Sequence, residues 1–173
     1  GGAYSNHIAA TAFATREKGL KSIGIIRGEK HFPLNPTLSF ARENNMELHY
    51  VSRSDYREKT TPHFLEKLKV QFGNFYLLPE GGTNELAIKG TEEILDVSDA
   101  QDFICCSVGT GGTIAGIINT TNSMQQVIGF PAIKGSDTLL KDVRCWTNNK
   151  NFKFINSYSY GGYAKVSKEL IHF

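Results

Sequence analysis

The sequence predicts an α/β protein built on doubly wound parallel sheets. Segments with helical periodicity alternate with short apolar segments in the order α-β-α-β-α-β between residues 7 and 78. The apolar segments are nearly continuous, as in Ser-Ile-Gly-Ile-Ile-Arg at 22–27, which is typical of strands covered on both faces. A third observation is the succession of apolar strand, glycine-rich turn and apolar helix at 102–118.

The first elements are defined by their caps and by alanine-rich composition. A small, largely buried helix is expected at His7–Lys18, capped by Ser5 or Asn6 and ended by Gly19. A strand follows at 22–27.

The chain then repeats this pattern. We expect a helix at 37–45, a strand at 47–52, a polar exposed connection at 53–61, a helix at 62–72 and a strand at 74–78. The helix at 62–72 carries apolar residues at helical spacing and a proline in its first turn, where proline is tolerated.

The second half begins with another glycine turn, Pro-Glu-Gly-Gly-Thr-Asn at 79–84, before a helix at 85–95. A buried strand at 103–108 leads into the glycine loop and a helix at 113–119. The remaining expected elements are a strand at 126–130, a helix at 136–143, a strand at 152–156, an aromatic glycine-rich loop at 158–163 and a helix that starts at 166.

Composition excludes several classes of protein. The 173 residues make one ordinary domain or two small ones, and 40% hydrophobic with 21% charged residues is typical of globular proteins. A net charge of +2 without a basic stripe gives no support to nucleic-acid binding. No apolar run approaches the length of a membrane span, so we expect no membrane association.

The cysteines favour a reducing compartment. Cys105, Cys106 and Cys145 make an odd count, and two of them are adjacent within the expected strand. This pattern indicates reduced, buried thiols in a cytoplasmic protein and no disulfide framework. The cysteines and histidines show no metal-ligand spacing, so no metal site is expected.

The loop Gly109-Thr110-Gly111-Gly112-Thr113 is a candidate anion site. Glycines let the backbone approach a ligand closely, and the first N–H groups of the following helix are unpaired and carry the positive end of the helix dipole. The two threonine hydroxyls can donate hydrogen bonds to the same anion. The alternative is a plain strand-to-helix turn with no ligand.

The surrounding residues narrow the choice of anion. The loop lacks a Gly-Lys-Ser/Thr ending, and its glycine spacing lacks the last glycine of the dinucleotide fingerprint. No lysine or arginine occurs between Gln101 and Met124. A phosphate held only by backbone N–H groups and hydroxyls suits a small monoester such as pyridoxal phosphate. An unrelated nucleotide-binding enzyme and a protein-interaction module remain alternatives.

Three stretches together resemble a known family: residues 1–7 (Gly-Gly-Ala-Tyr-Ser-Asn-His), residues 78–84 (Leu-Pro-Glu-Gly-Gly-Thr-Asn) and residues 107–113 (Ser-Val-Gly-Thr-Gly-Gly-Thr). Their order and spacing resemble the 1-aminocyclopropane-1-carboxylate deaminase/D-cysteine desulfhydrase family. These are pyridoxal-phosphate enzymes of the tryptophan-synthase β-like fold, also called fold type II. The resemblance extends from Gly1 to at least Tyr163.

The resemblance implies roles for individual residues. Asn6 matches a residue that bonds the pyridoxal O3′ atom, and Ser5 one that helps to bind the substrate carboxylate. His7 stands where a glutamine often sits and is a candidate carboxylate ligand. The loop 109–113 matches the phosphate site. Without the resemblance, Ser5 and Asn6 are equally well explained as helix caps, and His7 as an ordinary first-turn histidine.

A catalytic tyrosine is implied in the aromatic loop, where Tyr160 and Tyr163 are the candidates and Tyr158 lies in the same stretch. For each of them a packing role is the alternative. Glu80 is interpreted as loop structure, and Gly81 and Gly82 as backbone requirements of the second glycine turn.

The resemblance also implies what this chain lacks. In the family, the lysine that forms the imine with the cofactor lies upstream of the Gly-Gly-x-x-Ser-Asn turn, with which this sequence begins. We therefore expect a part of a longer protein with an incomplete larger domain. Residues 1–19 and 86–173 are assigned to the larger, cofactor-binding domain and residues 20–85 to the smaller α/β domain.

The implied activity is that of a deaminase or desulfhydrase. Such an enzyme acts on a small amino acid, 1-aminocyclopropane-1-carboxylate or D-cysteine, and releases ammonia and a 2-oxo acid, and the parent enzyme is expected to be a homodimer. The alternative is an inactive chain that at most binds phosphate or pyridoxal phosphate.

Overall fold

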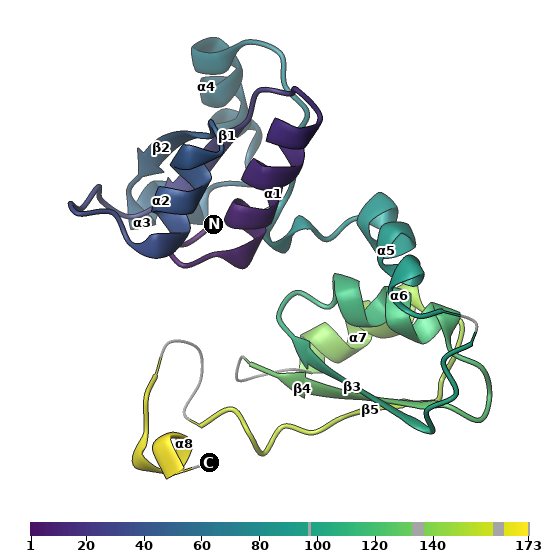
Figure 1. Cartoon of the computed structure of the whole chain (residues 1–173). Helices are drawn as coiled ribbons and strands as arrows, with labels where there is room; N and C mark the ends of the chain where they lie inside the picture. The colour runs from purple at the N-terminus through teal and green to yellow at the C-terminus, as the bar shows by residue number, and fades with distance from the viewer. Residues whose placement is uncertain (97, 133–136, 161–164, 173) are drawn as a thin grey trace. The chain divides into compact units, whose positions relative to one another are not determined.

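The computed structural model describes residues 1–96, 98–132, 137–160 and 165–172. The chain divides into two compact units, Gly1–Glu80 and Gly81–Phe173, each with its own parallel sheet (Figure 1). The predicted α/β class with parallel sheets is confirmed.

The first unit contains a parallel pair of strands. Its elements are α1 (Asn6–Glu17), β1 (Ile23–Arg27), α2 (Pro36–Glu43), β2 (Glu47–Val51), α3 (Arg53–Arg57) and α4 (Pro62–Phe72). Strands β1 and β2 pair in register from Ile23 opposite Glu47 to Arg27 opposite Val51. Asparagine and threonine side chains cap α2 and α4, since Asn35 and Thr61 each accept a hydrogen bond from the backbone N–H three residues on.

Helices cover both faces of this pair. On one face, Ile8 and Ala12 of α1 pack with Ile26 of β1 and with residues of α2 in a single buried cluster. Successive side chains of a strand point to opposite faces, and His49 of β2 faces the other way, where its ring meets Phe72 of α4 edge-on at 5.1 Å. The arrangement is the doubly wound one that the alternation of elements predicts.

The second unit contains the remaining elements: α5 (Glu85–Thr91), the short 3-10 turn η2 (Glu92–Ile94), β3 (Phe103–Val108), α6 (Gly112–Thr120), β4 (Gln126–Pro131), α7 (Asp137–Trp146), β5 (Phe152–Phe154) and α8 (Lys168–His172). A further 3-10 turn, η1 (Glu80–Gly82), lies at the boundary between the units. Among the described residues, the strands form one parallel sheet in the order β3-β4-β5.

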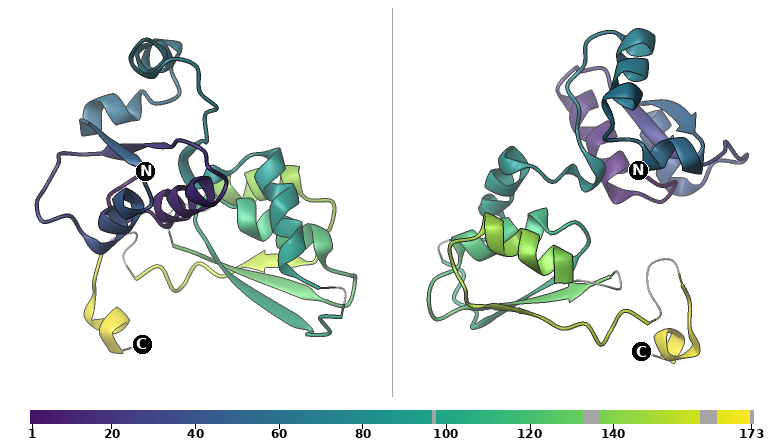
Figure 2. Two further views of the ribbon diagram at one scale, coloured as in Figure 1. Left: turned by 45° about the horizontal axis from the view of Figure 1, so that its top comes forward. Right: turned by 180° about the vertical axis from the view of Figure 1, so that it is seen from behind.

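The core of the second unit lies on one face of its sheet. Figures 1 and 2 show α6 and α7 together over the same side of β3–β5. Val108, Val127 and Val143 are fully buried there with the isoleucines of α6. On the other face Phe103 is 63% exposed, and Cys105 is exposed as well. The expected strand at 103–108 is therefore present, but the expectation that it is buried was wrong for one face.

The expectation that the cysteines are buried was also wrong in part. Cys105 and Cys106 point to opposite faces because they are neighbours in a strand. Cys106 is half-buried beneath the helices, whereas Cys105 and Cys145 are exposed. All three are free thiols, as expected, but they are not all buried.

Three local expectations also differ from the structure. The connection at 53–61 contains α3, which buries Tyr56. Residues 74–78 form no strand in the described structure, because no neighbouring strand pairs with this apolar segment. Tyr76 in this segment is 70% exposed. The helix expected at 85–95 is divided into α5 and η2.

In this structure α1 packs within the first unit. The assignment of residues 1–19 to the larger domain stays a prediction about the whole protein. Among the helices of the described residues, none combines the length and the apolar composition needed to cross a membrane.

Candidate active site

The glycine loop follows β3 directly. Its start is anchored because the carbonyl of Val108 accepts a hydrogen bond from the N–H of Ala132 after β4 (3.0 Å). Gly109 is exposed, and a Cβ atom added there would meet nothing within 4 Å. Gly111 has φ +90°, a left-handed conformation that favours glycine, and a Cβ atom there would lie 2.8 Å from Cγ2 of Val143. The loop therefore needs glycine at 111 for its shape and leaves open space at 109.

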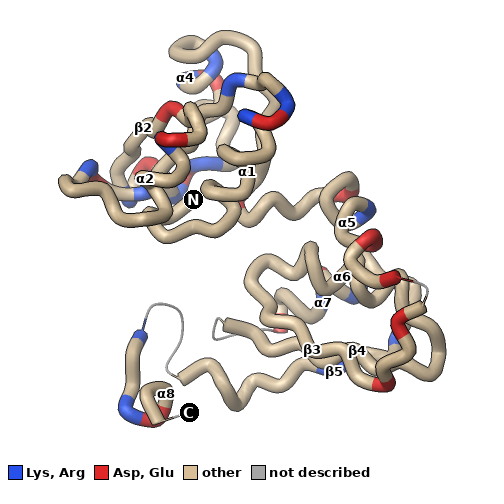
Figure 3. The backbone as a smooth tube through the Cα atoms, in the orientation of Figure 1, with Lys and Arg blue, Asp and Glu red and all other residues tan. Residues whose placement is uncertain are grey.

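Unpaired donors gather at the end of the loop. Helix α6 begins at Gly112 after Gly111, which has no side chain that could cap it. Within the described structure, no hydrogen bond uses the N–H groups of Gly112, Thr113 or Ile114; the first bonded one belongs to Ala115 (3.0 Å to the Gly111 carbonyl). These donors and the helix dipole favour an anion. Figure 3 shows no charged residue in the turn from β3 to α6.

A hydroxyl pair lies beside these donors. Thr83 Oγ1 and Thr110 Oγ1 are 2.6 Å apart. In such a pair one hydroxyl donates to the other, and the accepting hydroxyl keeps its own proton for a further acceptor. A Cβ atom on Gly112 would lie 2.8 Å from Thr83 Oγ1, so the two turns are packed tightly against each other. From the sequence, Thr83 or Asn84 was expected to cap the helix that follows. Asn84 is the cap of α5, and Thr83 instead pairs with Thr110.

The only tryptophan of the chain lies at the loop. A Cβ atom on Gly111 would be 3.4 Å from Cζ3 of Trp146, which ends α7. Thr113, in the first turn of α6, is exposed and free to face a ligand. Unpaired backbone donors, a hydroxyl pair and the exposed Thr113 make a donor set that fits the phosphate of pyridoxal phosphate.

The N-terminal turn is shaped by hydrogen bonds of its own. The N–H of Ser5 donates to the carbonyl of Gly2 (3.1 Å), and Ser5 Oγ accepts from the N–H of Ile8 (3.4 Å). Asn35 Nδ2 donates to the carbonyl of Ala3 (3.0 Å) and ties the turn to α2. Ser5 is thus the helix cap, which confirms that part of the prediction. Its role toward a substrate is not tested by this contact.

Asn6 and His7 open α1 with different environments. The Asn6 side chain is exposed, while His7 is half-buried. Burial lowers the pKa of His7 below its usual value of 6.5, so the neutral imidazole is favoured at pH 7. A neutral imidazole has one nitrogen that donates and one that accepts.

Glu80 has a larger role than the sequence indicated. Tyr56 donates its hydroxyl to Glu80 Oε1 (3.1 Å), and Lys59 Nζ pairs with Glu80 Oε2 (3.3 Å). Burial, with Glu80 in support, raises the pKa of Tyr56 well above its ordinary range. Within the first unit, Glu80 is therefore held by Tyr56 of α3 and by Lys59. No sequence signal indicated these contacts, because Tyr56 and Glu80 are 24 residues apart in the chain.

The aromatic loop is described in part. Tyr158 lies 5.9 Å from Phe130 at the end of β4, and its ring centroid is 6.3 Å from that of Tyr160. Tyr160 has φ +40°, a left-handed conformation that is uncommon for a side chain of this size. Tyr163, the other catalytic candidate, lies outside the described residues.

The structure thus brings the loop 109–113 together with Thr83 in the second unit, while Ser5, Asn6 and His7 lie in the first unit. Across the described ranges, no group of three or more His, Cys, Asp or Glu side chains is placed to hold a metal ion.

Comparison with solved structures defines the class of fold. The processed form of threonine deaminase isoform 2 from Solanum lycopersicum has a TM-score of 0.58 at 18% identity, covering 92% of this chain and 43% of that one. A hydrogen sulfide-producing enzyme from Fusobacterium nucleatum has a TM-score of 0.57 at 20% identity, covering 96% and 54%. A pyridoxal 5'-phosphate-dependent aspartate racemase is also similar, with a TM-score of 0.56 at 21% identity, covering 85% of this chain and 44% of that one. The fold is that of pyridoxal-phosphate enzymes of fold type II.

Curated relatives confirm the sequence resemblance. A Thermotoga maritima protein named "Putative 1-aminocyclopropane-1-carboxylate deaminase" is 32% identical over 98% of this chain and 61% of its own length. The bifunctional D-cysteine desulfhydrase/1-aminocyclopropane-1-carboxylate deaminase of Arabidopsis thaliana is 32% identical over 68% of this chain and 34% of its own. The chain is thus a homologue of these proteins. No protein-family model matches it.

The chain spans only part of the relatives. It covers 61% of the Thermotoga protein and 58% of a similarly named Pyrococcus abyssi protein that is 25% identical.

Proposed function

We propose that the whole protein is a pyridoxal-phosphate-dependent deaminase or desulfhydrase of a small amino acid. The observation that carries the proposal is the glycine loop, after which three N–H groups at the start of α6 have no partner in the described structure. Homology to proteins named for these activities supports it. The substrate is 1-aminocyclopropane-1-carboxylate or D-cysteine, and the products include ammonia and a 2-oxo acid.

In this proposal residues 109–113 hold the phosphate of the cofactor. The N–H groups at the start of α6 and the hydroxyls of Thr110 and Thr113 would donate to the phosphate oxygens, and the helix dipole would offset the phosphate charge. When bound, pyridoxal phosphate supplies an electron sink for the carbon next to the substrate nitrogen. The binding free energy comes from backbone donors, so no lysine or arginine is required in the loop.

The family resemblance implies roles for the N-terminal turn in the whole protein. The exposed amide of Asn6 would donate to the ring oxygen O3′ of the cofactor, while Ser5 and the neutral His7 would donate to the substrate carboxylate. Tyr160 or Tyr163 holds or moves a proton at the substrate. These roles rest on the family resemblance, and the exposure of Asn6 and the neutral state of His7 are compatible with them.

The lysine that such an enzyme requires is not assigned to this chain. Lys18, Lys21 and Lys30 are all exposed in the first unit, on a helix end or in connections. The second candidate function is a chain that binds phosphate or pyridoxal phosphate without turnover. A homodimer, a cytoplasmic location and a larger domain that includes residues 1–19 are further parts of the proposal for the whole protein.

The fluorescence of Trp146 tests cofactor binding in this chain. Because the indole lies at Gly111, pyridoxal phosphate bound at the loop should quench it. We expect quenching by pyridoxal phosphate but little by 5-deoxypyridoxal, which lacks the phosphate. Thr113→Val should weaken the quenching about fivefold, while the exposed Thr60→Val in the first unit should not. Equal quenching by both compounds would contradict the assigned phosphate site.

Turnover separates the two candidate functions. The protein is incubated with pyridoxal phosphate and either 1-aminocyclopropane-1-carboxylate or D-cysteine, and the 2-oxo acid is measured with a hydrazine reagent. Product from the whole protein supports the enzyme. Phosphate-dependent quenching without product from the whole protein supports the binding-only alternative.

A further inference from the structure

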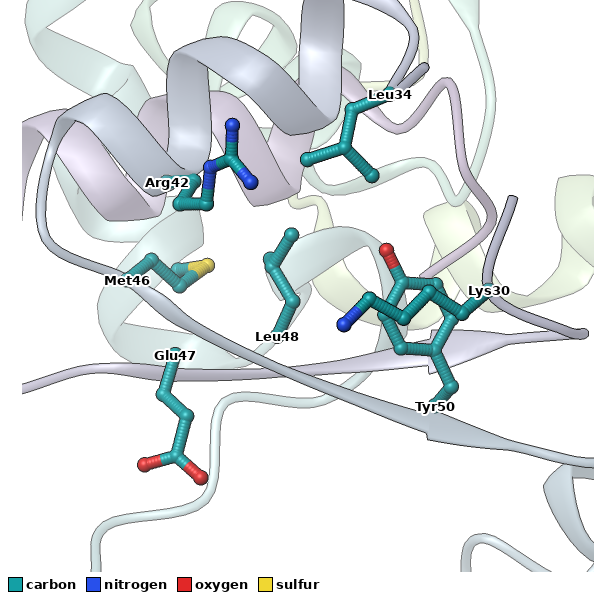
Figure 4. Close-up of a pocket in the computed structure, with 7 residues that line it drawn as sticks. All are labelled: Lys30, Leu34, Arg42, Met46, Glu47, Leu48 and Tyr50. Atoms are coloured by element: carbon teal, nitrogen blue, oxygen red, sulfur yellow. The ribbon is translucent and has the colours of Figure 1, made fainter. Parts of the chain in front are cut away.

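A cavity that is remote in sequence from the glycine loop lies within the first unit between α2 and β2. It has a volume of about 240 Å³, room for about eight water molecules. Its apolar lining comes from Leu34, Met46 and Leu48. Figure 4 shows these side chains together with Lys30, Arg42 and Tyr50 around the cavity.

Two cations border this cavity, and neither is neutralised by an ion pair in the described structure. Arg42 extends from α2 and Lys30 from the connection after β1, and both are exposed. Among the described residues, neither forms an ion pair; Lys30 Nζ rests 4.9 Å from the ring centroid of Phe32. Glu47 also borders the cavity, but it alternates with Leu48 along β2 and its carboxylate turns the other way (Figure 4).

A third polar group in the cavity lacks a partner. The hydroxyl oxygen of Tyr50 is buried and has no hydrogen-bond partner in the described structure. Burial raises the pKa of this phenol, against the effect of Arg42, so the group is a neutral donor at pH 7. Buried hydroxyls are normally satisfied. An oxygen atom from a ligand would satisfy this one.

We propose that this cavity binds a small monocarboxylate with a short apolar chain. The carboxylate lies between Arg42 and Lys30 and accepts a hydrogen bond from the Tyr50 hydroxyl. The apolar chain packs on Leu34, Leu48 and Met46. The mixture of two cations, one donor and an apolar floor favours this class over inorganic phosphate, which would leave the apolar surface exposed.

The proposal does not depend on the glycine loop, because every residue of the cavity belongs to residues 30–50. The probe is pentanoate, with 1-pentanol as the neutral molecule of the same chain length. Binding is followed by the NMR methyl signals of Leu34, Met46 and Leu48 in the whole chain. We expect shifts with pentanoate and about tenfold weaker binding of 1-pentanol.

Substitutions of Arg42 and Tyr50 test which side chains contact pentanoate. Arg42→Gln should weaken pentanoate binding about fivefold, whereas Lys69→Gln, an exposed cation on α4, should leave it unchanged. Tyr50→Phe removes only the unpartnered hydroxyl, so it should weaken binding without lowering the melting temperature. None of these changes should alter quenching of Trp146 by pyridoxal phosphate. Equal affinity for pentanoate and 1-pentanol, absence of methyl shifts, or equal effects of the two cation variants would overturn the proposal.

Discussion

The hydroxyl oxygens of Thr83 and Thr110 lie 2.6 Å apart and join the two glycine turns of the chain. Both turns contain the sequence Gly-Gly-Thr, at residues 81–83 and 111–113. In the first of them, Gly81 has φ +73°, and a Cβ atom there would clash with Thr110. The candidate phosphate loop is therefore held in place by contacts with the turn at 81–83, and the two bonded threonines are 27 residues apart in sequence.

Removing this support should weaken phosphate binding without direct contact. Thr83→Val keeps the shape of the side chain but leaves Thr110 without its partner, so its hydroxyl is free to rotate. A hydrogen bond of this kind contributes about 1 kcal/mol, and we expect about fivefold weaker binding of pyridoxal phosphate, measured by Trp146 quenching. Thr83→Ser should restore the affinity. If the valine and serine variants bind equally well, Thr83 does not position the loop.

Gly111 and Gly109 should respond in opposite ways to alanine. At Gly111 the left-handed φ and the close approach to Val143 and Leu139 should make Gly111→Ala cost about 1–3 kcal/mol of unfolding free energy. At Gly109 a Cβ atom meets open space, so Gly109→Ala should change stability by less than about 0.5 kcal/mol. Urea unfolding of the two variants provides the comparison. Equal loss in both would contradict the described loop geometry.

His7 should make stability depend on pH. Burial lowers its pKa in the folded chain below the usual 6.5, so the unfolded chain binds a proton first as the pH falls. The unfolding free energy should decrease as the pH drops from 7.5 through 6.5, and should level off below the folded pKa. His7→Gln should flatten this part of the profile. The exposed His63→Gln serves as the control, and a flattening as large as that in the His7 variant would contradict the assignment.

The two adjacent cysteines should react at different rates. Cys105 is exposed on the open face of β3, while Cys106 is half-buried beneath the helices, and burial raises the pKa of its thiol. Thiolates are the reactive form, so a maleimide should label Cys105 and Cys145 before Cys106. Peptide mass spectrometry at short times measures the order. Faster labelling of Cys106 than of Cys105 would contradict this structure, because it would mean that the helices cover the face of β3 that carries Cys105.

The sequence predicted most elements because local signals determine them. The strand at 103–108 and the helix at 62–72 have the expected bounds, set by apolar runs, a proline and flanking glycines. The exposed segment at 74–78 was mistaken for a strand because apolar character alone does not provide a pairing partner. The open face of β3 could not be predicted either, since burial depends on what covers a strand.

For the candidate site, the sequence predicted the loop 109–113 and the Ser5 cap from their residue types. It missed Thr83, Glu80 and the cavity at Tyr50, because their contacts join segments that are distant in sequence or, at the cavity, depend on the packing of α2 on β2. A signal for Thr83 was present in the repeated Gly-Gly-Thr. Glu80 had none, because its bonds to Tyr56 and Lys59 depend on the placement of α3.

Cofactor binding at residues 109–113 can be tested by an amide NMR titration of the isotope-labelled chain with pyridoxal phosphate. We expect the largest shifts at the N–H groups of residues 109–114, with those of Gly112, Thr113 and Ile114 moving toward the positions of hydrogen-bonded amides. Absence of shifts at residues 109–114, with changes elsewhere or none at all, would contradict the proposal that this loop binds the cofactor phosphate.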